Sequence, residues 1–117
     1  MKMSKIVLPC LVILLSLNLV YGFGVTTPYW DTSPLVMSPG QTLEFYLLLQ
    51  NMAGDGGDVT ATATVTGGNQ FAQITDSSNQ YNVPFGTKDT KINLKVSVPE
   101  GTPDGDYEIS ITVDSAP

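Results

Sequence analysis

The sequence predicts an all-β fold, a two-layered antiparallel β-sandwich of six to seven strands, from three observations. Residues 91–98 and 106–113 alternate strictly between apolar and polar side chains, as in strands with one buried and one solvated face. No segment after residue 22 has helical periodicity, and turn residues separate the apolar runs. The two alternating segments should contribute to one core, through Ile92, Leu94, Val96 and Val98 and through Tyr107, Ile109, Ile111 and Val113.

Residues 1–22 have the order of features typical of a secretory signal peptide. Two lysines precede an apolar run at residues 6–17, and the small residues Val20 and Gly22 suit positions −3 and −1 of a cleavage site. The mature chain is then expected to begin near Phe23 and to be exported, to the medium or to the cell surface. An uncleaved membrane anchor is the alternative, although the apolar run is short for a bilayer span.

Residues 23–33 are predicted to be an irregular lead-in, and the domain itself to cover residues 34–117. A short strand is expected at residues 35–37, because prolines on its N-terminal side exclude a longer one. After a Pro-Gly turn, residues 42–50 form the first long strand. Its second face carries Tyr46 and Leu48, which are either covered by the lead-in with Trp30 as a lid or exposed as an interaction surface.

The middle of the chain alternates strands with glycine-rich or polar turns. A turn at residues 51–57 precedes a strand at residues 58–66, where threonines alternate with small apolar residues. Two shorter strands are expected at residues 71–75 and 81–85, on either side of a polar loop. The following turn leads into the alternating strand at residues 91–98.

Charge and residue content exclude several classes of function. Removal of residues 1–22 leaves three lysines and eleven carboxylates, a net charge of −8, without arginine, histidine or cysteine. Nucleic acids and anionic membranes need clustered cations, so both are poor partners. Nucleophilic catalysis needs a base beside the nucleophile, and the remaining lysines offer no activated site. The chain is therefore predicted not to be an enzyme.

Calcium is the one cofactor that the residues suggest, and the suggestion is weak. Asp55 and Asp58 lie in one glycine-rich loop, and Asp104 and Asp106 lie in another. Calcium prefers several carboxylate and carbonyl oxygens, which two such loops would supply if they met at one end of the sandwich. Aspartate beside glycine is also ordinary turn chemistry. No bound cofactor is therefore predicted.

Short motifs in residues 34–114 resemble a known family. Pro39-Gly40, a strand that ends at Asn51, the turn Val83-Pro-Phe-Gly86, a strand that closes on Val98-Pro99, and Gly105-Asp-Tyr-Glu-Ile109 occur together. This order is similar to the immunoglobulin-like accessory modules of archaeal and bacterial cell-surface (S-layer-type) proteins and of some secreted glycosidases. The resemblance implies an immunoglobulin-like sandwich and says little about mechanism.

Two departures from that family matter for the fold. The resemblance implies that the hydroxyl of Tyr107 bonds upstream backbone, but Pro103 stands where the family usually has an aspartate, so either this corner is imperfect or Asp104 substitutes. Family members also continue into one further strand after residues 107–109. Here the lead-in fills that position, or the sequence is a fragment of a longer surface protein, or the open edge accepts a strand from a partner.

Two functions follow from these considerations. The first is a non-catalytic structural or interaction module at the prokaryotic cell surface, whose partners are other surface proteins. The alternative is a carbohydrate-binding accessory module of a secreted polysaccharide-active system, in which Trp30, Tyr29 and Tyr46 stack on sugar rings. Leu48 completes the set of candidate interaction residues. A membrane contact is expected only through an uncleaved N-terminal segment or an anchor encoded further downstream.

Overall fold

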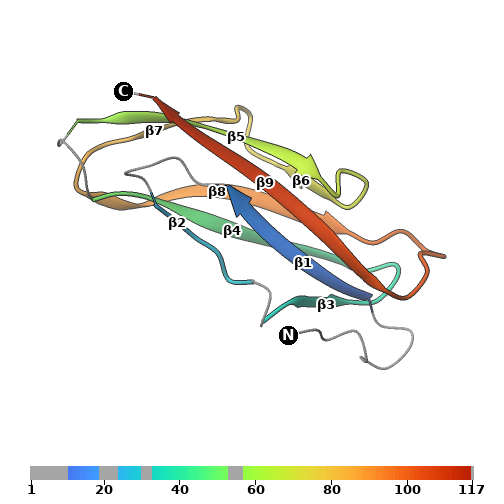
Figure 1. Ribbon diagram of the computed structural model, residues 1–117. Coiled ribbons are helices and arrows are strands. Elements are labelled where there is room, and N and C mark those ends of the chain that lie inside the picture. Colours follow the sequence, from blue (N-terminus) through green and yellow to red (C-terminus); the bar gives the residue numbers. More distant parts are fainter. Residues whose placement is uncertain (1–10, 19–23, 30–32, 53–56, 117) are drawn as a thin grey trace.

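The computed structural model describes residues 11–18, 24–29, 33–52 and 57–116, which form nine strands in two facing sheets (Figure 1). The predicted all-β, two-layered character is confirmed, and no helix occurs within the described residues. The strands are β1 (Leu11–Asn18), β2 (Gly24–Thr26), β3 (Leu35–Met37), β4 (Thr42–Asn51), β5 (Val59–Gly67), β6 (Ala72–Ile74), β7 (Gln80–Val83), β8 (Thr87–Ser97) and β9 (Asp106–Ala116).

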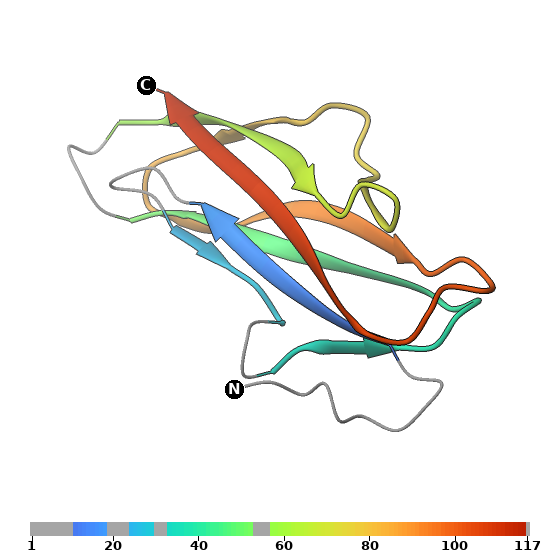
Figure 2. The same cartoon turned by 45° about the vertical axis from the view of Figure 1, so that its right-hand side comes forward.

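One sheet has the strand order β3-β1-β9-β5-β7 and the other the order β2-β4-β8-β6. Neighbouring strands are antiparallel except β1 and β9, which run parallel (Figure 2). The prediction of a wholly antiparallel sandwich is therefore wrong at one pair. The predicted count of six to seven strands is also too low, because it left out β1 and β2.

The core lies between the two sheets and is apolar. Of the eight residues predicted to share it, all are buried except Tyr107, which is partly buried against the others. The two alternating segments that predicted them lie in opposite sheets, β8 in one and β9 in the other, so residues 98–105 cross between the layers. The period of two thus identified the buried face of each strand but not the sheet to which it belongs.

Beyond those eight, the core draws on every strand whose burial is described except β2. Leu47 and Leu49 on β4 and Val83 on β7 have no exposed surface. Small residues, Ala61 and Ala63, occupy the buried face of β5. Both sheets therefore contribute long and short apolar side chains to the described core.

The turn after β5 requires glycine at position 68. Gly68 has a φ of 74°, a backbone conformation that L side chains rarely adopt. A Cβ there would lie 2.7 Å from the backbone oxygen of Glu108 and 2.9 Å from Cγ1 of Ile109. The chain can therefore turn toward β6 only by passing directly over β9, with no side chain between them.

Asn51 links the two sheets at the end of β4. Its side chain is 2% exposed, and its Nδ2 donates to the backbone oxygens of Gly57 and Val83, both at 2.9 Å. Val83 belongs to β7 of the opposite sheet. The asparagine that closes the predicted first long strand is therefore a buried polar bridge, and its hydrogen bonds offset the cost of burying the amide.

The N-terminal part of the chain differs most from the prediction. The lead-in is not wholly irregular, because Gly24–Thr26 form β2 and pair with β4. β2 lies in the opposite sheet from β9, so of the three alternatives for the position beside β9, the one in which the lead-in fills it is wrong. That position is taken by β1, which lies within the segment predicted to be a signal peptide. A near-continuous apolar run is typical of buried parallel strands as well as of signal sequences, so the sequence alone does not separate the two.

Candidate functional site

The strand position between β3 and β9, here called the acceptor position, is the first candidate site. Here β1 pairs with β9 along seven residues, from Val12 opposite Asp106 to Asn18 opposite Thr112. On its other side it pairs with β3, where Leu11, Val12 and Ile13 stand opposite Met37, Val36 and Leu35. Within the described residues, β3 pairs with no other strand. A single strand in this position therefore joins β3 to the rest of its sheet.

The two faces of β9 determine which positions of a neighbouring strand lie beside apolar side chains and which lie beside acidic or polar ones. Ile109, Ile111 and Val113 are buried, whereas Glu108 and Asp114 are exposed on the opposite face. Successive residues of a strand point to opposite sides of the sheet. A strand beside β9 therefore has buried apolar neighbours at alternate positions, and its intervening positions lie beside acidic or polar side chains.

A shallow apolar cleft beside β2 and β4 is the second candidate site. It has a volume of about 350 Å³, and its lining residues are Thr26, Thr27, Pro28, Tyr29, Phe45, Tyr46 and Leu48. The rings of Tyr29 and Phe45 meet edge to face, with centroids 5.0 Å apart. This geometry is a favourable one for aromatic pairs and holds the described end of the lead-in against β4.

Tyr46 is the exposed aromatic residue of this cleft. Its side chain is 45% exposed, and the Nζ of Lys91 lies 4.5 Å from the ring centroid. The described part of the lead-in does not cover Tyr46, while Leu48 beside it is half-buried. Trp30, the predicted lid, lies outside the described residues. The structure thus brings Tyr29, Tyr46 and Leu48, three of the candidate interaction residues, together around one cleft.

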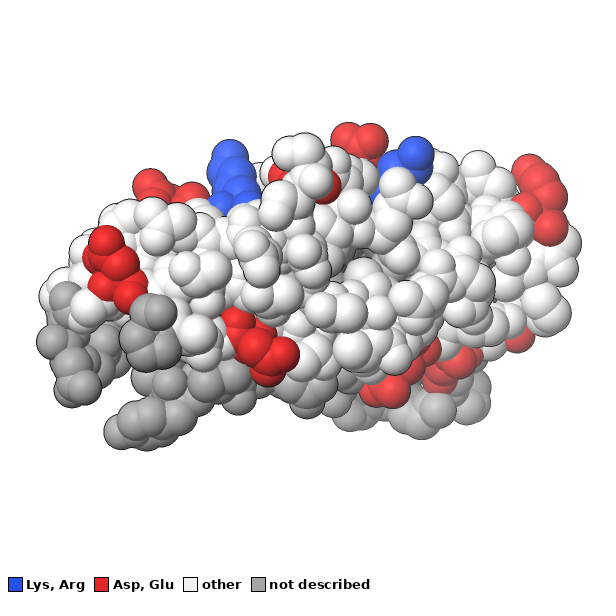
Figure 3. All heavy atoms as spheres, turned by 90° about the horizontal axis from the view of Figure 1, so that it is seen from above, with Lys and Arg blue, Asp and Glu red and all other residues white. Residues whose placement is uncertain are grey.

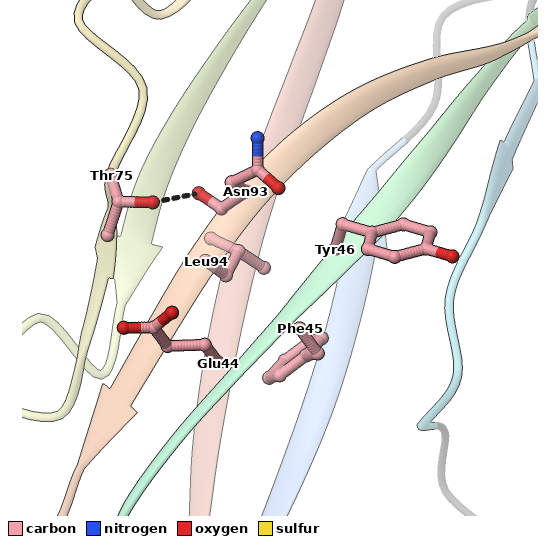
Figure 4. A pocket seen from close by; sticks show the side chains of 6 residues that line it. All are labelled: Glu44, Phe45, Tyr46, Thr75, Asn93 and Leu94. Atoms are coloured by element: carbon pink, nitrogen blue, oxygen red, sulfur yellow. Dashed lines mark hydrogen bonds between the residues drawn. The ribbon is translucent and has the colours of Figure 1, made fainter.

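A second hollow, of about 320 Å³, lies on the other side of Tyr46 (Figure 4). Glu44 and Phe45 on β4, with Asn93 and Leu94 on β8, form its floor and walls. Thr75 closes one end, where its hydroxyl donates to the backbone oxygen of Asn93 at 3.4 Å. The hollow is shallow and contains one carboxylate, so it offers a polar contact surface beside the aromatic cleft rather than a catalytic arrangement.

Asp76 organises the polar contacts behind this hollow. Its Oδ2 accepts from the hydroxyl of Tyr81 at 2.8 Å and from the backbone N–H of Asn93 at 2.9 Å, and its Oδ1 accepts from Nδ2 of Asn93 at 2.7 Å. Tyr81 lies on β7 and Asn93 on β8, so the carboxylate bridges the two sheets. The sequence placed Asp76 only in a polar loop, because nothing in the local pattern indicates that Tyr81 and Asn93 both reach its carboxylate.

The bridge shifts the acidity of both of its titrating members. Burial alone would raise the pKa of Asp76, but the hydrogen bonds from Asn93 and Tyr81 outweigh burial and lower that pKa below its usual value. The pKa of Tyr81 is raised, first by burial and then by its hydrogen bond to the negative Asp76. At neutral pH the pair is therefore a phenol donating to a carboxylate.

This lowered pKa predicts how the bridge responds to acid. Because the folded state holds Asp76 ionised more readily than the unfolded state, the bridge stabilises the fold above the unfolded value of about 4. That contribution disappears as the pH falls through the folded pKa. We expect the difference in free energy of unfolding between the native chain and Asp76→Asn, measured by urea titration, to be constant near neutral pH and to shrink in acid. A difference that does not change between neutral pH and about pH 2.5 would contradict the bridge.

The structure keeps the described candidate calcium ligands apart. Asp58 lies just before β5, and Asp106 begins β9; the antiparallel pairing puts Thr60 opposite Ala116, at the far end of β9. Asp58 and Asp106 are therefore roughly 30 Å apart, at a rise of about 3.3 Å per residue. Oδ1 of Asp58 accepts from the backbone N–H of Phe85 at 2.9 Å. Asp55 lies outside the described residues, and among those described no group of three or more acidic, histidine or cysteine side chains is placed to hold a metal.

Tyr107 makes the backbone hydrogen bond that the sequence suggested. Its hydroxyl donates to the backbone oxygen of Pro103 at 2.7 Å, and its ring packs edge to face on Phe71 with centroids 5.1 Å apart. The corner forms through a backbone carbonyl, so Asp104 does not substitute for the aspartate that the family carries. This contact fixes the loop that leads the chain from one sheet into β9.

The surface around these sites is acidic. Figure 3 shows carboxylates spread over the face seen from above, with fewer lysines among them.

In the described part of the chain, no helix has the length and apolar character to cross a membrane. No protein-family model matches the chain, and none of the curated proteins compared with it shows significant similarity.

Proposed function

We propose that this protein is a non-catalytic interaction module with an immunoglobulin-like sandwich, exported through residues 1–22 and working at the prokaryotic cell surface. The observation that carries the proposal is the acceptor position. The strand that occupies it, β1, lies within the segment whose sequence is that of a signal peptide. If export removes that segment, an edge suited to another polypeptide opens.

Other features of the chain agree with this function. The two layers and the hydroxyl of Tyr107 on the backbone of Pro103 support the immunoglobulin-like assignment. The net charge of −8 expected for the mature chain would keep an exported module soluble. The polar groups that the fold gathers, around Asp76 and Asn51, join one sheet to the other. They support a structural role rather than a chemical one.

Export and processing are tested by expressing the full chain in a secretion-competent prokaryote. We expect the protein outside the cytoplasm, with an N-terminus near Phe23 by mass spectrometry. A matched variant, Lys2→Glu with Lys5→Glu, removes the positive charge before the apolar run. This variant should stay inside the cell, with a mass that still includes residues 1–22. Native chain found inside the cell with its first 22 residues intact would contradict the proposal.

A carbohydrate-binding accessory role is the second candidate, and the cleft around Tyr46 is what favours it. Sugar rings stack on exposed aromatic faces, and Tyr46 is the exposed ring here. The ring of Tyr29 packs on Phe45, so Tyr46 is the exposed aromatic platform among the described residues of the cleft, with the Nζ of Lys91 over one face of its ring. Saturable binding to a glycan panel that is lost in Tyr46→Ala and kept in Phe85→Ala, another exposed aromatic residue, would favour this role over the first.

A further inference from the structure

The acceptor position matters to both of its neighbours. β3 has β1 as its partner in the sheet, and β9 has β1 along the edge that β5 does not occupy. Without a strand there, every second residue along this seven-residue stretch of β9 would turn its backbone N–H and C=O groups toward an empty edge. β3 would also lose its place in the sheet. We therefore expect another strand to bind at this position in the mature protein.

Apolar residues beside the acceptor position are a second reason to expect a strand there. Leu35 and Met37 on one side and Ile109 and Ile111 on the other are buried in the structure with β1 in place. Removing a strand from between them would bring part of this apolar surface into water, which is unfavourable in proportion to its area. An exposed, apolar sheet edge is a template for pairing with another chain.

The register of β1 defines the chemistry of a suitable occupant. Leu15 and Leu17 stand opposite the buried residues Ile109 and Ile111, so the occupant needs apolar residues at those alternate positions. Val12 and Leu14 stand opposite Asp106 and Glu108, on the other face of β9. Basic residues there would complement the acidic surface, because opposite charges on neighbouring strands stabilise the pair.

We infer that, in the exported protein, the acceptor position binds an extended segment of a second, different protein, apolar at alternate positions and basic between them. This inference rests on the proposed function, since the position opens only when residues 1–22 are removed. Binding would occur by strand addition, in which backbone hydrogen bonds supply affinity and alternate side chains supply specificity. A second mature copy of this chain would lack residues 11–18, so we assign the segment to a different protein.

A peptide titration tests the inference on the exported protein, after its N-terminus has been confirmed by mass. The probe is the fluorescent, end-capped peptide Lys-Ile-Lys-Leu-Ser-Leu-Asn, which keeps the apolar positions of β1 opposite β9 and puts lysine opposite Asp106 and Glu108. The control peptide, Ile-Lys-Lys-Leu-Leu-Ser-Asn, has the same composition without alternation. We expect saturable binding of the probe alone, because a break in alternation puts lysine on the buried face.

Two charge variants locate the bound peptide. Glu108→Lys lies within the stretch of β9 that pairs with β1, and Asp114→Lys lies on the same face beyond that stretch. Both change the net charge equally. Glu108→Lys should weaken binding several-fold, up to about five-fold, as expected for an exposed charge pair, and Asp114→Lys should leave it nearly unchanged. An uncleaved Gly22→Leu chain should not bind, because β1 already fills the position.

The outcomes separate this inference from the proposed function. Exported, processed and folded protein that binds neither peptide, or both equally, overturns the inference and leaves export intact. Equal weakening by the two charge variants also overturns it, because binding would then follow net charge. A mature protein that sediments as a dimer without peptide would assign the position to a second copy instead. A chain that keeps residues 1–22 contradicts the proposed function, and with it the inference that depends on that function.

Discussion

Leu47→Ala is expected to lower the free energy of unfolding by roughly 2–5 kcal/mol, whereas Leu48→Ala, one residue further along β4, should cost about 1 kcal/mol. Leu47 has no exposed surface and faces the other sheet, opposite Ile92 in the register of β8. Leu48 lies on the outer face and is half-buried in the aromatic cleft. The same deletion should therefore leave a cavity at one position and not at the other.

Urea unfolding of the two variants and the native chain, under one set of conditions, measures this difference. Residue type, strand and the number of atoms removed are matched, so the comparison isolates the face of β4 that packs on the other sheet. Equal losses would mean that the register of β4 is slipped by one residue or that the second sheet does not cover it.

Asn51→Asp is expected to be as damaging as the loss of a large core side chain, at about 3 kcal/mol or more near neutral pH. The substitution keeps the shape of the side chain but removes the two N–H donors that reach the backbone oxygens of Gly57 and Val83. A carboxylate oxygen would then face those carbonyl oxygens in a buried position. The two carbonyl oxygens would lose their hydrogen-bond donor, and the new negative charge would lie beside them in a buried position.

The pH dependence of Asn51→Asp provides a second check. Burial would raise the folded pKa of the introduced carboxyl above its unfolded value, so the cost grows as the pH rises above about 4 and is smallest in acid. Thermal unfolding over a range of pH should show the variant approaching the native chain at low pH. Asn82→Asp makes the same charge change at an exposed position of β7 and should differ little from the native chain at any pH. A cost for Asn51→Asp that is independent of pH would contradict a buried amide bridge.

The strands were largely predictable from sequence because their signals are local. Alternation gave the buried faces of β4, β5, β8 and β9, and the turn residues around them gave approximate ends. Pairing is not local. Nothing in residues 91–98 or 106–113 says that the two strands lie in opposite sheets, and the short β2 has three residues with little pattern to read.

The candidate sites show the same division. Tyr46 and Leu48 were identified because an apolar outer face is visible in the sequence of one strand. The bridge at Asp76 was missed because its partners, Tyr81 and Asn93, come from two other strands that the sequence does not pair with it. β1 was missed for a different reason: an apolar run after lysines fits both a signal peptide and a buried parallel strand.

Hydrogen exchange along β9 measures whether the acceptor position takes one added strand. In the exported protein, the backbone amides of residues 106–112 that point toward the acceptor position should exchange faster than in the uncleaved Gly22→Leu chain, and the alternating peptide should slow them again. The amides of β4 and β8, paired in the other sheet, should change little. Exchange of residues 106–112 that is the same in both forms, and the same with and without peptide, would contradict the addition of a strand.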